Sequence, residues 1–154
     1  MTIVCISLPM MGHILPILEL SRKIEKEYDT DVHIVSSKCV AKYVTYKNLH
    51  VIDDDIPPKL YPKVGHQTAM CKMLQNGMID IIAKLKPKLL ISDVWCYAAN
   101  EVSRILEIPL IICQPNDIKY AEKMYNDELD FTNVLPLEYN FNSYNPEVDY
   151  IKTV

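Results

Sequence analysis

The stretch Ser7-Leu-Pro-Met-Met-Gly-His-Ile-Leu-Pro16 decides the fold. It ends a short apolar run, Thr2 to Leu8, and opens an amphipathic segment, Ile14 to Tyr28. A buried strand, a tight turn at Gly12 and a helix form the first half of a β-α-β unit. Gly12 lets the backbone turn and lets a ligand approach closely. The strand-to-helix turn of such a unit lies at the carboxyl edge of the sheet, where α/β proteins bind ligands, so His13 is predicted to lie at a functional site.

The rest of the chain repeats this alternation of strand and helix. Strands are expected at 2–8, 31–36, 49–52, 88–93 and 109–113, and helices at 14–28, 38–47, 66–85, 98–106 and 117–125. Continuous apolar strands between helices predict a parallel sheet covered by helices on both faces. The strands at 2–8, 88–93 and 109–113 are the most apolar and belong at the centre. We therefore predict a Rossmann-like, doubly wound α/β fold with strand order 3-2-1-4-5 and right-handed crossovers.

Two helices and the end of the chain carry more specific expectations. In the helix at 38–47, Val40, Tyr43 and Val44 are expected to point inward. The helix at 66–85 is expected to be continuous, because its apolar residues recur at helical spacing. Residues 1–125 are expected to form one domain, and residues 126–154, which are polar and without clear periodicity, an irregular polar tail.

Composition argues against several classes of protein. The chain has 154 residues, a net charge of −4 and no cluster of Lys and Arg, which argues against a nucleic-acid partner. No apolar stretch approaches the length of a membrane span, and the first apolar run is too short for a signal peptide, so we expect a cytoplasmic protein. The five cysteines include no CxxC pair, and the four histidines have no metal-ligand spacing. We therefore expect reduced thiols and no metal site.

The predicted topology brings two polar residues together. His13 follows the first strand and Asp93 ends the fourth, and these strands are neighbours at the switch point of the sheet. A carboxylate that accepts from one imidazole nitrogen leaves the other nitrogen to take a proton from a substrate hydroxyl. No Ser or Cys nucleophile accompanies the pair, which favours base catalysis over covalent catalysis. The plainer alternative is that His13 only starts its helix and Asp93 only caps the next one.

The surroundings of this pair suggest a ligand of mixed character. No G-x-G-x-x-G segment and no Walker A loop occur, so a dinucleotide is not indicated. His33 and His50 lie within strand patterns and are interpreted as structural. Methionines and an aromatic ring near His13 suit a mostly apolar molecule that carries a hydroxyl. The candidate substrate-binding residues are Met10, Met11, Gly12, Met70, Trp95 and Gln114.

Two segments resemble the N-terminal domain of family 1 UDP-glycosyltransferases. The first is Met11-Gly-His-Ile-Leu-Pro-Ile-Leu-Glu-Leu20, which is similar to the family's G-H-x-x-P segment. The second is Lys86-Pro-Lys-Leu-Leu-Ile-Ser-Asp-Val-Trp95, followed by Glu107-Ile-Pro109, where Glu107 replaces the glycine of the family's G-I-P turn. The resemblance covers roughly residues 1–115. It implies one half of a GT-B fold, in which two Rossmann-like domains face each other.

The resemblance also implies a mechanism and partners. His13 would deprotonate an acceptor hydroxyl, Asp93 would support it, and sugar transfer from a UDP-sugar would invert the anomeric carbon. The family's C-terminal domain, which holds the donor, has no counterpart in these 154 residues. We therefore expect no bound cofactor, an apolar hydroxyl-bearing acceptor, and a donor-binding subunit or a homo-oligomer as partner. A split transferase, a non-catalytic small-molecule-binding or interaction protein, and a fragment of a longer product all fit the sequence.

Overall fold

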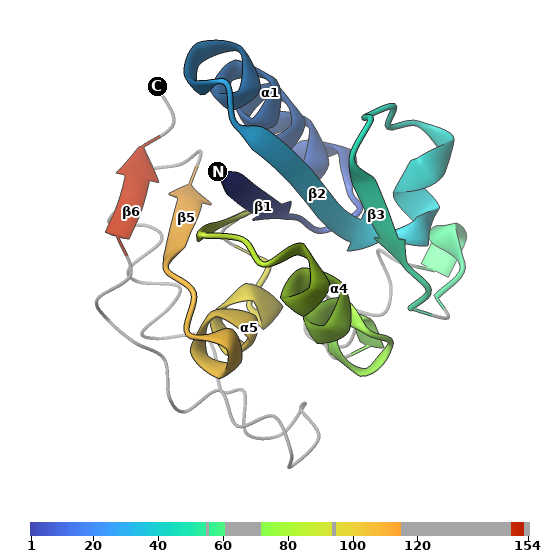
Figure 1. Ribbon diagram of the computed structural model, residues 1–154. Coiled ribbons are helices and arrows are strands. Elements are labelled where there is room, and N and C mark those ends of the chain that lie inside the picture. The colour runs from blue at the N-terminus through green and yellow to red at the C-terminus, as the bar shows by residue number, and fades with distance from the viewer. Residues whose placement is uncertain (55, 61–71, 94, 115–148, 153–154) are drawn as a thin grey trace.

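The protein folds around one parallel β-sheet (Figure 1). The structure is a computed structural model that describes residues 1–54, 56–60, 72–93, 95–114 and 149–152. The strand order is β3-β2-β1-β4-β5-β6, and every pairing is parallel. The strands are β1 (Thr2–Ile6), β2 (Asp31–Ser37), β3 (Leu49–Ile52), β4 (Leu89–Asp93), β5 (Leu110–Gln114) and β6 (Asp149–Lys152). The first five strands confirm the predicted order 3-2-1-4-5.

Helices cover both faces of the sheet, as predicted. Helix α1 (Met11–Tyr28) lies on one face, and α4 (Met78–Leu85) and α5 (Ala98–Leu106) lie on the other (Figure 1). Side chains of a strand alternate between the two faces, so β1 contributes to two separate cores. Ile3 and Cys5 pack with the buried side of α1, whereas Val4 and Ile6 pack with α4 and α5. An apolar strand between two apolar layers accounts for the continuous run that the sequence shows there.

The register of the central strands places the end of β1 beside the end of β4. In the β1–β4 pairing, Ile6 is the partner of Ser92. The loop that begins at Ser7 therefore leaves the sheet beside Asp93, the last residue of β4. Strands β2 and β4 pair with β1 on opposite sides, so the chain diverges at this point of the sheet. This is the switch point at which doubly wound proteins place their ligands.

The turn after β1 differs from the prediction. Helix α1 begins at Met11, and the Met10 carbonyl accepts from the backbone N–H groups of His13 and Ile14 at 2.9 Å each. Gly12 therefore lies inside the helix, and its φ is not in the left-handed region. The expectation of a tight turn at Gly12 is wrong, because the chain turns earlier. A Cβ atom built on Gly12 would meet nothing within 4 Å, so the space beside it is open.

The helix expected at 38–47 is much shorter in the structure. Residues Lys38–Lys42 form a 3-10 helix, η1, and the Ser37 hydroxyl accepts from the Cys39 backbone N–H at its start. The Tyr-Val-Thr-Tyr run that follows consists of weak helix formers, so no α-helix continues. Val40 and Val44 are buried as expected, but Tyr43 is 44% exposed. The prediction that Tyr43 points inward is therefore wrong.

The long helix expected at 66–85 is interrupted. Residues 72–75 are helical, a turn follows at Asn76 and Gly77, and α4 then begins at Met78. Gly77 has a φ of +106°, which glycine adopts readily and other residues do not. Residues 66–71 of the expected helix lie outside the described residues.

The end of the chain contains one strand that was not expected. Strand β6 pairs in parallel with β5 at the edge of the sheet (Figure 1). Four residues are too few for their periodicity to stand out in a polar segment, so the expectation of an irregular tail is wrong at 149–152. The expected helix at 117–125 and the boundary between 125 and 126 lie outside the described residues. In the parts of the chain that the structure describes, no helix has both the length and the apolar character that crossing a bilayer requires.

Candidate active site at the carboxyl edge of the sheet

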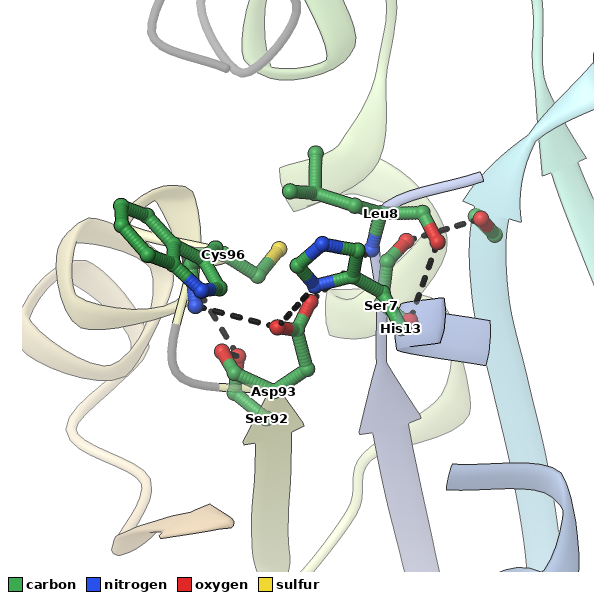
Figure 2. Close-up of polar contacts among 8 residues, drawn as sticks. Ser7, Leu8, His13, Ser92, Asp93 and Cys96 are labelled. Carbon is green, nitrogen blue, oxygen red and sulfur yellow. Dashed lines mark hydrogen bonds and ion pairs between the residues drawn. The ribbon is translucent and has the colours of Figure 1, made fainter. Parts of the chain in front are cut away.

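A histidine and an aspartate meet at the switch point. His13 comes from the first turn of α1 and Asp93 from the end of β4. Their closest atoms, Nδ1 of His13 and Oδ1 of Asp93, are 2.9 Å apart. Figure 2 shows the Asp93 carboxylate at the tip of its strand, directed at the imidazole ring. The structure thus brings together the two residues that the sequence paired by topology alone.

Asp93 is held by the backbone as well as by the imidazole. Its Oδ2 accepts from the Leu8 N–H at 3.1 Å, and its Oδ1 accepts from the Trp95 N–H at 3.0 Å. Its side chain is 8% exposed, against 19% for the imidazole. An ionised carboxylate can only accept hydrogen bonds, so Nδ1 of His13 carries the hydrogen. The arrangement therefore fixes the tautomer in which Nε2 is the basic nitrogen.

No activated thiol lies beside this pair among the described cysteines. Burial, and then the negative charge of Asp93, raise the pKa of Cys96 well above its usual value. The same two causes raise the pKa of Cys113 to about 11. A thiol with so high a pKa carries almost no thiolate near neutral pH and is a poor nucleophile. The site is therefore equipped for proton transfer rather than for covalent catalysis by these thiols.

The serine hydroxyl groups near Asp93 donate hydrogen bonds to backbone carbonyls. Ser7 donates to the Leu8 carbonyl at 3.0 Å, and Ser92 donates to the Asp93 carbonyl at 2.9 Å. Both serines are buried. They stabilise the turns that carry the site, which is a structural contribution. Serines at the ends of two adjacent strands are the sequence signal that marks these turns.

The other candidate binding residues differ in exposure and in contacts. Met11 is 48% exposed on the first turn of α1, whereas Met10 is partly buried against the core. Trp95 is also partly buried and meets Tyr97 edge to face, with 6.3 Å between ring centroids. Gln114 ends β5, where its backbone pairs with β6. Met70 and the side chain of Gln114 lie outside the described part of the structure.

A second histidine–aspartate contact lies at the opposite edge of the sheet. Nε2 of His33 is 2.8 Å from Oδ2 of Asp31, the first residue of β2, and Nδ1 of His33 is 2.9 Å from Nε2 of His50. Burial, and then the charge of His33, lower the pKa of His50. The hydrogen bond from His33 is the main cause that lowers the pKa of Asp31. This network lies at the amino edge and offers a matched control for the His13–Asp93 pair.

Metal binding finds no support in the described residues. The portions of the chain that the structure describes hold no group of three or more His, Cys, Asp or Glu side chains arranged to ligate a metal ion. The network at the amino edge has two imidazoles and one carboxylate, but the imidazoles bond to each other.

Comparison with known proteins identifies the fold. No protein-family model matches the chain, and no curated protein matches its sequence. The solved structures that resemble it include the glycosyltransferase SsfS6 of Streptomyces sp. SF2575, with a TM-score of 0.62 and 16% identity over 80% of this chain. The glycosyltransferase SnogD of Streptomyces nogalater matches with a TM-score of 0.60 and 13% identity over 73% of the chain. UGT2 of Phytolacca americana, complexed with UDP-2fluoro-glucose and pterostilbene, matches with a TM-score of 0.56 and 17% identity over 73%.

These matches cover only part of each solved chain. The chain corresponds to 42% of SsfS6, 33% of SnogD and 29% of UGT2. Identities this low establish a shared Rossmann-like α/β fold and nothing about activity. The chain thus has the fold of less than half of each of these glycosyltransferases.

Proposed function

We propose that this chain is the acceptor-binding half of a UDP-sugar-dependent glycosyltransferase of the GT-B type. The observation that carries the proposal is the 2.9 Å contact between His13 and Asp93 at the switch point of the sheet. A supported imidazole is well suited to general base catalysis, in which histidine is the side chain most often used. The structural likeness to glycosyltransferases makes removal of a proton from an acceptor hydroxyl the most economical use of that base.

In the proposed reaction His13 is the base and Asp93 its support. Nε2 of His13 takes the proton of the acceptor hydroxyl while the acceptor oxygen attacks the anomeric carbon of the donor sugar. The new oxygen–carbon bond forms as the bond between that carbon and the UDP oxygen breaks, so the configuration inverts. Asp93 stabilises the imidazolium that results, because its carboxylate already accepts from Nδ1. Release of that proton to solvent returns the base to its starting state.

The donor sugar requires residues beyond the site described above. A nucleoside diphosphate is commonly held by a glycine-rich loop at a helix N-terminus, and the sequence contains only three glycines and no such loop. We propose that a separate donor-binding module supplies this site, in a partner subunit or in a further part of a longer product. Two structural neighbours support the choice of donor class: SsfS6 has been solved with thymidine diphosphate, and UGT2 with UDP-2fluoro-glucose.

The acceptor is proposed to be mostly apolar with at least one hydroxyl. Met11 is exposed one residue before Gly12, beside which the space is open. A methionine adapts to ligands of irregular shape, and a glycine lets a ring approach the helix closely. Pterostilbene, which UGT2 holds in its solved complex, is a molecule of this class and a suitable probe.

One observation favours a second candidate function, a non-catalytic binding or interaction protein. Asp93 accepts hydrogen bonds from two backbone N–H groups in addition to the imidazole. A residue that fixes two loops has a structural reason to be present even without catalysis. Binding of an acceptor at His13 without any sugar transfer would favour this second function.

The test is a titration of the isotopically labelled chain with pterostilbene, monitored through the histidine ring signals by NMR. The His13 signals are expected to shift with a saturable dependence on ligand, and those of His33, at the other edge of the sheet, are expected to stay in place. Calorimetry with UDP should show no binding near micromolar strength, which would correspond to about −8 kcal/mol. Shifts at His33 but not at His13, or micromolar UDP binding by this chain alone, would overturn the proposal.

A further inference from the structure

The segment that connects β1 to His13 is held by hydrogen bonds to three different parts of the fold. The Ser36 hydroxyl of β2 donates to the Ser7 carbonyl at 2.8 Å. The Asp93 carboxylate of β4 accepts from the Leu8 N–H. The Tyr43 hydroxyl, at the end of η1, donates to the Pro9 carbonyl. Three successive residues thus each bond to a different element of the fold.

The hydrogen bond from Tyr43 restrains Pro9, the residue that precedes the N-cap of α1. A proline ring locks φ, and proline has no N–H, so the carbonyl is its only backbone hydrogen-bonding group. The orientation of that carbonyl is set by ψ, the one soft backbone angle that remains at Pro9. A hydrogen bond from Tyr43 therefore restrains the only freedom at this residue. Met10 follows as the N-cap of α1, and its carbonyl accepts from the His13 N–H at 2.9 Å.

Tyr43 contributes more to the restraint of Pro9 than to the packing of the core. Ser7 and Leu8 are fully buried, whereas Tyr43 is 44% exposed. Burial, and then the nearby Cys39, raise the pKa of Tyr43 to about 12. The hydroxyl therefore keeps its hydrogen near neutral pH and remains a donor to Pro9. Loss of the hydroxyl would therefore remove the restraint on Pro9 while removing little apolar contact.

We propose that Tyr43 is a positioning residue for His13, which it orients through the Pro9 carbonyl. The proposal rests on the proposed function, because the orientation of the ring is useful only if His13 acts as a base. A small displacement of a base can lower a rate by about 100-fold. In the assembled enzyme, Tyr43→Phe is therefore expected to lower kcat by roughly 10-fold or more, with an acceptor KM within about twofold of the parent.

The decisive measurement does not need turnover. The His13 Nδ1–H, which is bonded to Asp93, gives an NMR signal whose exchange with solvent reports how firmly the ring is held. Tyr43→Phe is expected to speed that exchange by roughly 10-fold and to leave the His33 Nε2–H signal unchanged. The matched control is Tyr46→Phe, because the Tyr46 hydroxyl donates to the Val32 carbonyl at 3.4 Å, well along β2 from the site.

The outcomes separate this proposal from the proposed function. The proposal holds if Tyr43→Phe speeds exchange at His13 and Tyr46→Phe does not, while both variants melt at similar temperatures. Unchanged exchange in Tyr43→Phe, or equal acceleration in both variants, would overturn it. Failure of pterostilbene to shift His13 in the parent chain would count against the proposed function alone, because the exchange measurement would still decide whether Tyr43 positions the ring.

Discussion

Asp93→Asn should destabilise the fold as well as disable the proposed base, His13. The carboxylate accepts three hydrogen bonds: Oδ1 accepts from His13 and Trp95, and Oδ2 accepts from Leu8. The amide of asparagine has one acceptor oxygen and one donor nitrogen, so it cannot replace both carboxylate oxygens. Its better orientation keeps the oxygen at the Oδ1 position and turns the NH2 group toward the Leu8 N–H.

The magnitude follows from that donor-to-donor contact. Leu8 is fully buried, so its N–H would be left without a partner inside the protein. A buried, unsatisfied donor costs about 1–3 kcal/mol. The weakening of the two remaining bonds adds to this cost, and the easier burial of a neutral amide offsets part of it. We therefore expect the free energy of unfolding to fall by about 1–3 kcal/mol.

The assay is urea unfolding at pH 7 with a matched control. The control, Asp31→Asn, removes the carboxylate that faces His33, but the Asp31 side chain is 55% exposed, so its loss should cost less than about 1 kcal/mol. The slope of the unfolding free energy against urea should stay the same in both variants, because the same surface is exposed on unfolding. An Asp93→Asn protein that unfolds at the parent's urea midpoint would refute the reasoning, since Asp93 would then not fasten the loop.

Four further predictions follow from other positions in the fold. Gly12→Ala should raise the free energy of unfolding by about 0.4–1 kcal/mol, because Gly12 lies in a helix with open space beside it, and should weaken pterostilbene binding by filling that space. Gly77→Ala should lower the free energy of unfolding by about 1–2 kcal/mol, because Gly77 has a φ of +106°; equal urea midpoints for these two variants would contradict at least one of the two predictions. The lowered pKa of His50 means that the unfolded chain binds a proton that the folded chain resists, so stability should fall as the pH drops below about 6.5. His50→Gln should flatten that slope in urea unfolding between pH 7.5 and pH 5.5, and an unchanged slope would assign it to another group. Burial raises the pKa of Cys5 to about 12 and that of Cys113 to about 11. Neither thiol should therefore react with a thiol reagent at pH 7.5 until urea unfolds the chain. Modification of either cysteine in the native protein, detected by mass spectrometry, would contradict the burial.

The strand order could be predicted because it depends on hydrophobic patterns that can be read directly from the sequence. The most apolar strands had to be central, and right-handed crossovers then fixed their neighbours. That order alone brought His13 and Asp93 to one edge, although they are far apart in the sequence. The apolar character of β1, β4 and β5 therefore carried the information about the site.

The fastening of the loop could not be predicted in this way. Its contacts depend on the path of the backbone between Ser7 and Met10, and on the early end of η1 that leaves Tyr43 at the surface. Helical periodicity placed Tyr43 inward, since a pattern cannot show where a short 3-10 helix ends. Likewise, the break at Gly77 was hidden by apolar residues that continue at helical spacing on both sides of it.

The most direct test of the central claim is the rate of sugar transfer by the assembled enzyme after His13→Ala. We expect the rate to fall by roughly two to four orders of magnitude, the usual range for loss of a general base. The acceptor KM should stay within about threefold of the parent, the variant should melt like the parent, and His33→Ala should transfer sugar at a nearly parental rate. Near-parental transfer by a folded His13→Ala enzyme would contradict the account and would make the His13–Asp93 pair a structural feature.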